Sequence, residues 1–200
     1  MAYDEAIDTT PREAAPNQTE DVARSEGLER IHLTDSLHWE IVEFLEDEST
    51  ALDDNELTAW FQNMAPDIVY RLPVRMTRDR ADGSEFAEGM FHFDEDYMTL
   101  GTKVMRLAAT QSAWAEKPPS RTRRFVTNIR AYRLDGDAEE YEVRSCILIV
   151  RNRYQESDLE VLSARRTDIL RRTDEGFKIA RRTILVDQAT LGMQNLAIFL

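Results

Sequence analysis

The chain has 200 residues, which fits one domain with a sizeable hydrophobic core. It contains no apolar run of the ~20 residues that span a membrane and no signal-peptide pattern at its start, so we expect a soluble, cytoplasmic protein without a membrane partner. The net charge is −13, but residues 1–60 hold 17 acidic and 3 basic residues whereas residues 61–200 hold 21 and 22, which argues against nucleic acid as a partner of the acidic part.

The first 30 residues predict a mobile acidic extension. They contain Pro11, Pro16 and many carboxylates, and they show no sustained apolar periodicity. A segment of this composition buries too little apolar surface to fold alone. We therefore expect residues 1–30 to form an extension and residues 31–200 to form a single domain.

The next residues predict two helices. Between residues 35 and 48 apolar side chains recur at the interval of one helical face, and Thr34 or Asp35 can cap the first turn. Asp53 followed by Glu56 is typical of a capping box. A second, shorter helix is therefore expected to begin near residue 53.

A strand and a third helix follow. Residues 68–76 favour a strand, but Pro73 cannot donate a ladder hydrogen bond, which places this strand at a sheet edge or marks a bulge. Asp94 can cap a helix over residues 95–109, which Gly101 weakens slightly.

After residue 120 the pattern changes to β. Residues 124–134 and 141–153 predict two strands, and the run Cys146–Val150 is apolar on both faces, which indicates a central strand covered on both sides. Cys146 is the only cysteine, so we expect it to be a buried, reduced thiol. Helices followed by an antiparallel meander indicate an α+β fold.

The last third of the chain predicts a β-hairpin that carries arginine pairs. Two β-rich arms flank a turn at residues 173–176, where Gly176 can adopt a positive φ. Because successive strand residues face opposite ways, each pair should place one guanidinium on each face of the sheet. The pairs are Arg165 and Arg166, Arg171 and Arg172, and Arg181 and Arg182. These side chains need carboxylate partners, either on another protein or across the ladder at Glu142, Glu160, Asp168 or Asp187.

Four motifs occur in collinear order between residue 33 and the end of the chain. They are Phe44–Glu48 with Leu52–Asp54, Tyr70–Arg75, Pro118–Arg124 with Thr127 and Asn128, and the arginine-rich stretch from Leu159 onwards. In series they resemble the small (beta) subunit of Rieske-type aromatic ring-hydroxylating dioxygenases. The resemblance implies a cone-shaped, nuclear-transport-factor-2-like fold, in which a strongly curved, mainly antiparallel sheet packs on about three N-terminal helices.

The resemblance also implies a function and partners. The chain would be a non-catalytic structural subunit that supports the assembly of large (alpha) subunits and associates with itself as a trimer within an α3β3 hexamer. The large subunit would hold a Rieske 2Fe-2S cluster and a mononuclear non-haem iron. Electron-transfer proteins would act on this complex, which would convert an aromatic ring to a cis-dihydrodiol with O2 and electrons from NAD(P)H.

The cysteine and histidine content of the chain agrees with the expectation that the large subunit holds both iron centres. A Rieske cluster needs two thiolates on one iron, and this chain has one cysteine. A mononuclear iron site needs two histidines and a carboxylate, but His32, His38 and His92 show no spacing that brings two of them together. Nucleophile-elbow and phosphate-loop motifs are also missing from the sequence. We expect no cofactor and no catalytic residue in this chain.

The matching motifs imply an assembly surface rich in arginine. It comprises Arg71, Arg75, Arg121, Arg124, Arg165, Arg166, Arg181 and Arg182. Arginine is favoured at protein interfaces because its planar guanidinium holds carboxylates in a bidentate way. A nucleic-acid surface would need interleaved aromatic residues, and apart from Phe177 the hairpin has none.

A stand-alone enzyme remains the alternative. Cone-shaped folds also host isomerases, dehydratases and cyclases that act on small hydrophobic molecules with one base inside the cone. The candidate bases are Asp67, Tyr70, His92 and Asp94. Burial could bring any of their pKa values toward neutrality.

Overall fold

A computed structural model describes residues 28–78, 84–109, 120–136, 138–153, 157–192, 196 and 198–200. The predicted acidic extension lies almost entirely outside these residues and stays a prediction. Its proposed boundary falls inside a short strand, β1 (Arg30–Ile31), so Arg30 already belongs to the folded domain. Backbone pairing ties this strand to Ala131 and Tyr132.

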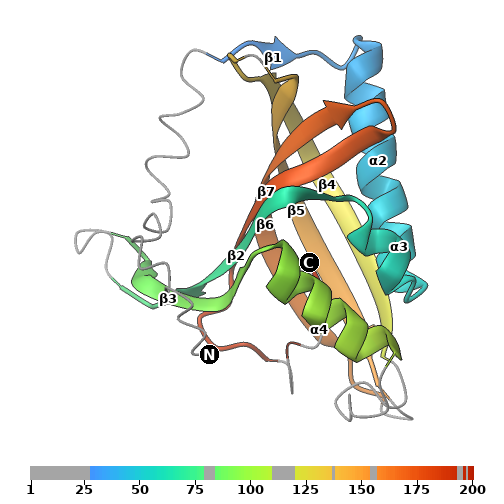
Figure 1. Cartoon of the computed structure of the whole chain (residues 1–200). Helices are drawn as coiled ribbons and strands as arrows, with labels where there is room; N and C mark the ends of the chain where they lie inside the picture. The colour runs from blue at the N-terminus through green and yellow to red at the C-terminus, as the bar shows by residue number, and fades with distance from the viewer. Residues whose placement is uncertain are drawn as a thin grey trace, which may run out of the picture.

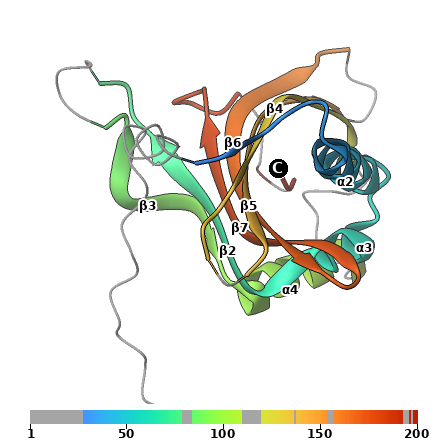
Figure 2. The ribbon, with the colours of Figure 1, turned by 90° about the horizontal axis from the view of Figure 1, so that it is seen from above.

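Seven strands of the described chain form one sheet (Figure 1) in the order β1-β4-β5-β6-β7-β2-β3. The remaining strands are β2 (Met64–Arg75), β3 (Phe86–Glu95), β4 (Arg121–Arg133), β5 (Glu140–Asn152), β6 (Glu160–Thr173) and β7 (Gly176–Val186). All neighbouring strands are antiparallel except β2 and β7, which run parallel. Figure 2 shows that the sheet curls strongly around one long helix. The predicted curved, mainly antiparallel α+β fold is confirmed.

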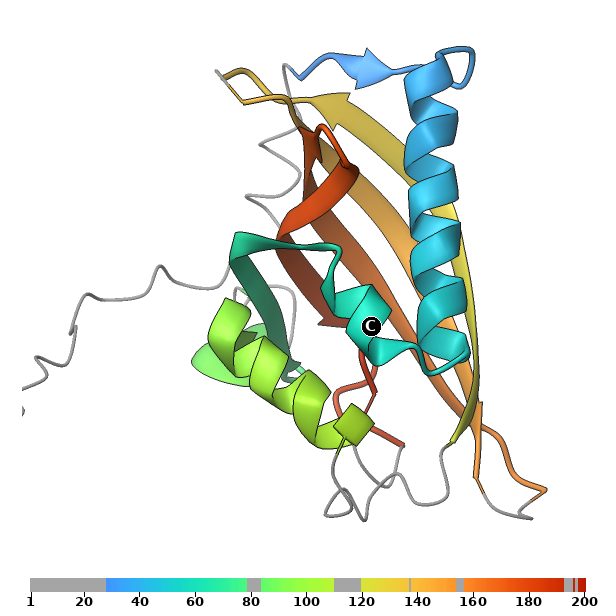
Figure 3. The same ribbon diagram turned by 45° about the vertical axis from the view of Figure 1, so that its right-hand side comes forward.

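That long helix is α2 (Ser36–Asp53), which lies along the concave face of the sheet (Figure 3). As predicted, the Asp35 carboxylate caps it by accepting a hydrogen bond from the Leu37 amide. The helix continues beyond residue 48 because Ser49 and Leu52 are also buried against the sheet. Packing against the sheet therefore determines the length of α2. None of the helices in the described part of the chain is long and apolar enough to cross a membrane.

Two predicted helix caps are wrong. The second helix, α3 (Leu57–Phe61), begins without a side-chain cap, and Asp53 is instead the last residue of α2. The third helix, α4 (Tyr97–Ala109), begins where Asp96 and Thr99 exchange hydrogen bonds. Asp94 lies in β3, a strand that the sequence pattern did not reveal.

The strand predictions for β2 and β5 need correction. Strand β2 lies between β7 and β3, so it is not an edge; the register shifts on both sides of Pro73, which confirms the alternative of a bulge. Strand β5 is central, and its inward residues Ile147 and Ile149 are almost fully buried. Its outward residue Leu148 is 39% exposed, so the described residues leave the outward face of β5 uncovered at this position.

The hairpin is confirmed in detail. Gly176 ends the predicted turn at residues 173–176 with φ +114°, and the hydroxyl of Thr173 donates to its carbonyl oxygen. Arg182 is fully buried whereas Arg181 is exposed, and Arg166 is fully buried whereas Arg165 is half-buried. The alternation of the two faces was therefore predicted correctly for these pairs. The buried face of the hairpin carries the polar contacts of Arg166 and Arg182.

Candidate functional site: a buried charge cluster and exposed arginines

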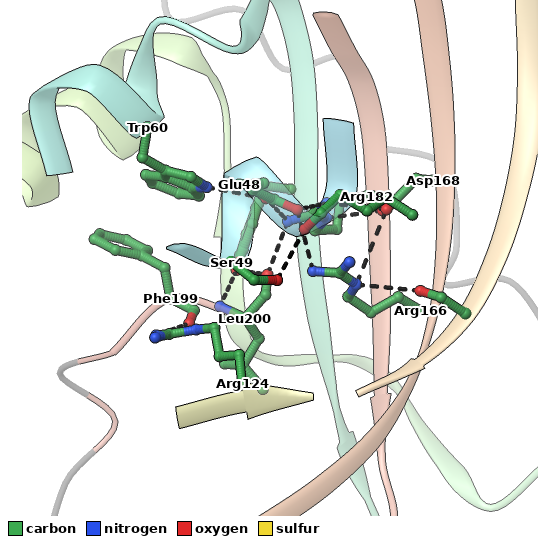
Figure 4. Close-up of polar contacts among 12 residues, drawn as sticks. Glu48, Ser49, Trp60, Arg124, Arg166, Asp168, Arg182, Phe199 and Leu200 are labelled. Atoms are coloured by element: carbon green, nitrogen blue, oxygen red, sulfur yellow. Dashed lines mark hydrogen bonds and ion pairs between the residues drawn. The ribbon is translucent and has the colours of Figure 1, made fainter. Parts of the chain in front are cut away.

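Four charged side chains meet inside the cone. Glu48 comes from α2, Arg166 and Asp168 from β6, and Arg182 from β7 (Figure 4), and each is 0% exposed. The Arg182 guanidinium donates from Nε to Asp168 Oδ1 at 2.8 Å and from Nη2 to Asp168 Oδ2 at 2.9 Å. It also binds both oxygens of Glu48, with Nη2 to Oε2 at 3.0 Å. Arg166 Nη1 donates to the same Oε2 at 3.4 Å.

Strand register explains how this cluster forms. Asp168 and Arg182 are direct cross-strand partners in β6 and β7, so their side chains leave the same face of the sheet. The stripe of Ile41, Leu45 and Glu48 on α2 then places the Glu48 carboxylate opposite that pair. Two arginines and two carboxylates are thus collected in the interior, where all four are fully buried.

The electrostatics of the cluster favour the charged forms of Glu48 and Arg182. Burial by itself would raise the pKa of Glu48, but Arg182 and Arg166 outweigh it and hold that pKa at about 2. Burial would likewise lower the pKa of Arg182, yet Asp168 and Glu48 raise it well above its usual value. Burial and the nearby charge of Arg182 lower the pKa of Arg166. Glu48 and Arg182 therefore strengthen each other's charged form.

The segment formed by residues 198–200 occupies the same interior. The Tyr70 hydroxyl donates to the Leu200 carbonyl oxygen and accepts from the Leu200 amide, both at 2.9 Å. Arg182 Nη1 also donates to that carbonyl at 3.0 Å, and Arg124 Nη2 donates to the Phe199 carbonyl at 2.8 Å. The Phe199 ring stacks on Trp60 at 4.5 Å between centroids. The chain's own residues thus fill the centre of the cone.

Three of the predicted interface arginines are structural. Arg166 and Arg182 are fully buried in the cluster, and the side chain of Arg124 is only 2% exposed. Arg124 Nη1 donates to Asp53, which also accepts from the Arg124 amide at 2.9 Å. The prediction that these three residues lie on the assembly surface is wrong, because each is buried and bound to a carboxylate of the same chain.

The other predicted arginines lie nearer the surface. Arg71 pairs with Asp94 at 3.0 Å and Arg75 pairs with Glu85, and both are half-buried. Arg121 is exposed beside Asn152, which accepts a hydrogen bond from it. Arg165 and Arg181 form no ion pair within the described residues. The cationic surface that another protein could reach is therefore smaller than predicted.

The candidate bases of an enzyme do not converge. The hydroxyl of Tyr70 is engaged by backbone, and burial raises its pKa to about 12. Asp67 is exposed and accepts two hydrogen bonds from Arg171, which lower its pKa, and Asp94 is bound to Arg71. Burial lowers the pKa of the half-buried His92. Nothing in this arrangement favours the stand-alone enzyme.

The histidines and the cysteine are also separate. No three of the His, Cys, Asp and Glu side chains in the described ranges are grouped so that they could hold a metal ion. Cys146 is half-buried and points outward from β5, where its Sγ accepts a hydrogen bond from Asn128. The prediction of a buried thiol is wrong, because only the inward face of β5 is covered within the described chain.

Sequence reasoning missed the central role of Glu48. It named Asp168 as a possible ladder partner, and this is confirmed, but it treated Glu48 only as part of a motif. The available signal was its position on the apolar stripe of the helix, three residues after Leu45 and seven after Ile41. A carboxylate on a buried face requires a cationic partner.

Comparisons with known proteins identify relatives. The family model for "Ring hydroxylating beta subunit" matches residues 47–193. The biphenyl 2,3-dioxygenase subunit beta of Rhodococcus jostii is 37% identical over 170 residues, which cover 82% of this chain and 89% of that protein. A chain of naphthalene 1,2-dioxygenase with indole bound superposes with a TM-score of 0.77 at 26% identity, covering 93% of this chain and 100% of that one.

A more distant structure shares the fold alone. A putative scytalone dehydratase from Novosphingobium aromaticivorans has a TM-score of 0.54 at 16% identity and covers 78% of this chain and 87% of its own. The cone-shaped architecture therefore occurs in chains of quite different sequence.

Proposed function

Because this chain belongs to the family of ring-hydroxylating dioxygenase beta subunits, we propose that it is the non-catalytic structural subunit of such an enzyme. The observation that carries this proposal is the occupied cone interior. The side chains of Glu48 and Arg182 and the backbone of Leu200 meet in the interior of the cone, which the chain's own groups therefore occupy. The chain then contributes surface and stability to its complex and makes or breaks no bond of the reaction.

The chemistry belongs to the partner in this proposal. The large subunit holds the Rieske 2Fe-2S cluster and the mononuclear non-haem iron, and the complex adds both oxygen atoms of O2 to an aromatic ring to give a cis-dihydrodiol. Electron-transfer proteins deliver electrons from NAD(P)H, and the complex works in the cytoplasm. A single cysteine cannot supply the ligands of a Rieske cluster, which supports placing it elsewhere.

Assembly is the contribution of this chain. We infer an α3β3 hexamer in which three copies of the chain contact one another and the large subunits. Burying surface of the large subunit stabilises its folded state through linkage and fixes the distances between neighbouring copies. The predicted interface arginines that are half-buried or exposed are Arg71, Arg75, Arg121, Arg165 and Arg181.

Co-expression with a candidate large subunit tests this function. We expect the chain alone to be free of iron and inactive, and the mixture to form a hexamer that contains iron and produces a cis-dihydrodiol. Native mass, iron content and product formation are the measurements. Stoichiometric iron or turnover in the isolated chain, or a large subunit that works equally well without it, would contradict the proposal.

A charge reversal probes the arginine contacts separately. Arg181→Glu removes an exposed cation with no described ion-pair partner, so we expect a lower hexamer yield and an unchanged fold of the isolated chain. Arg30→Glu, at an exposed arginine of β1, is the matched control. Native mass spectrometry measures the yield. Equal yields from both variants would remove Arg181 from the assembly surface.

A further inference from the structure

The outward face of the central strands carries an uncovered apolar patch. Phe125 on β4 is 51% exposed, Leu148 on β5 is 39% exposed and Val161 on β6 is 46% exposed. Phe125 is the register partner of Leu148, and Val150 is the register partner of Val161. We call these four residues the outer stripe. The register joins it across three strands. Its members alternate along these strands with the buried residues Arg124, Ile149 and Leu162, so the stripe lies on the face of the sheet that points away from the core.

The sequence of β5 shows that this exposure is unusual. A sheet with one face in water normally alternates apolar and polar residues, whereas the run from Cys146 to Val150 is apolar at every position. Ile147 and Ile149 are buried in the core of this chain. Leu148 and Val150 have the same character but lack an equivalent cover among the described residues. The pattern is that of a strand covered on both faces, with one cover supplied by another molecule.

The surroundings of the stripe indicate the chemistry of that cover. Arg123 is the register partner of Val150, and its side chain is 70% exposed although its guanidinium also lies 3.6 Å from Asp53 Oδ2. Arg165 lies opposite Cys146 and has no described ion-pair partner, while Asp187 at the margin is bound to Ser163. An apolar centre with an arginine-rich rim is the usual composition of a protein interface. Two such faces would repel each other, so a partner with carboxylates around an apolar centre is favoured over a second copy facing it.

We propose that the outer stripe is the docking surface for the large subunit. This inference rests on the proposed function and deepens it, because it names the surface of this chain that the partner covers. The partner surface would place apolar side chains against Leu148 and Phe125 and carboxylates against Arg123 and Arg165.

The chain carries its own reporter for this surface. Cys146 is its only cysteine, is half-buried, and lies in the register between Thr127 and Arg165. A covering partner excludes reagents from the thiol. We expect the rate of alkylation by iodoacetamide, followed by mass spectrometry of the peptide that contains Cys146, to fall at least about tenfold in the complex. An unchanged rate in a confirmed complex would overturn the proposal.

Substitutions test the surface independently. Leu148→Asp and Arg165→Glu should each raise the Kd for the large subunit at least about tenfold. Met98→Asp is the control, because Met98 is an exposed apolar residue on α4, 80% exposed beside a groove lined by Phe61, Tyr97 and Met105. We expect less than about a twofold change from it. Unchanged circular dichroism and urea midpoints would show that each variant folds.

The outcomes separate this proposal from the proposed function. If the wild-type chain fails to bind any candidate large subunit, the proposed function itself is in error. If the wild type binds and Leu148→Asp binds equally well, only the docking surface is wrong, and a loss confined to Met98→Asp would assign docking to α4. If Leu148→Asp alters only the native mass of the isolated chain, the stripe joins copies of this chain and the assignment to the large subunit is overturned.

Discussion

At the scale of single residues, the stability of the buried cluster depends on the presence of all four charged side chains. Burying one unpaired charge is strongly unfavourable, whereas a buried network is tolerated when each ion has a counter-ion and hydrogen bonds. Glu48 forms ion pairs with both arginines and also accepts a hydrogen bond from Trp60 Nε1 at 3.0 Å. It is therefore the member whose removal leaves most groups without a partner.

Glu48→Gln should destabilise the chain by about 3–5 kcal/mol, because it leaves buried positive charge that Asp168 alone cannot balance. Equilibrium urea unfolding measures this loss. Glu46→Gln, on the exposed side of the same helix, is the control and should change stability by less than about 0.5 kcal/mol. Similar unfolding curves for the two variants would show that the network contributes little.

Stability should also depend on pH through Glu48. Its pKa is about 2 in the folded chain and near 4.5 in a model peptide, so the unfolded state binds a proton first on acidification. The stabilisation is complete above pH 4.5 and is lost as the pH falls toward 2, by about 3 kcal/mol from this group. Urea unfolding between pH 2 and pH 7 should show this loss in the wild type. Glu48→Gln should lack that component, and an identical pH dependence would contradict the assignment.

At the scale of elements, one carboxylate joins α2 to the sheet. Asp53 ends the helix and accepts hydrogen bonds from the hydroxyl of Thr122 at 3.0 Å and from the amide and guanidinium of Arg124. Arg124 in turn holds the Phe199 carbonyl. The helix end, β4 and the segment 198–200 are thus positioned by one chain of contacts.

Asp53→Asn should weaken this junction, because the amide keeps the size of the side chain but loses the charge and one acceptor. We expect a loss of about 1–3 kcal/mol in urea unfolding. Asp54→Asn is the matched control at the adjacent exposed residue and should have little effect. Equal stabilities of the two variants would indicate that Asp53 serves α2 only locally.

At the scale of the whole molecule, side chains of the chain itself occupy the interior of the cone. The curved sheet and α2 enclose a space that Trp60, Tyr70 and Phe199 fill with aromatic rings, and charged groups fill the remainder. A closed interior suits a subunit whose partners meet its outer surface. The same fold can host other functions because function depends on what occupies this space.

Phe199→Ala should open a cavity beside Trp60 and cost about 3–5 kcal/mol, since the ring is 3% exposed and stacked. Phe125→Ala is the matched control, because that ring is 51% exposed and should contribute less than about 1 kcal/mol to the isolated chain. Denaturation of both variants by urea is the measurement. A small loss of stability from Phe199→Ala would mean that residues 198–200 pack only weakly in the interior of the cone.

Prediction from sequence succeeded where local periodicity carries the information. Strand alternation assigned Arg165 and Arg166 to opposite faces, and the helical stripe located α2. It located the Asp35 cap of α2 but failed at the caps of α3 and α4, because this chain has an acidic residue near every candidate start and several satisfy the local pattern. Asp53 accepts a hydrogen bond from Arg124 on β4 instead of capping α3, and the Thr99 amide donates to Asp96 rather than to Asp94.

The sequence by itself determined the family motifs, the α+β class and the fact that the hairpin arginines divide between two faces. Only the tertiary structure decided which face is inside, because a period of two is symmetric and does not distinguish the concave side of a sheet from the convex side. Closure of the sheet around α2 brought Glu48 to Arg166 and Arg182 across more than one hundred residues of chain. Contacts of that range depend on the three-dimensional path of the backbone, and no local pattern encodes them.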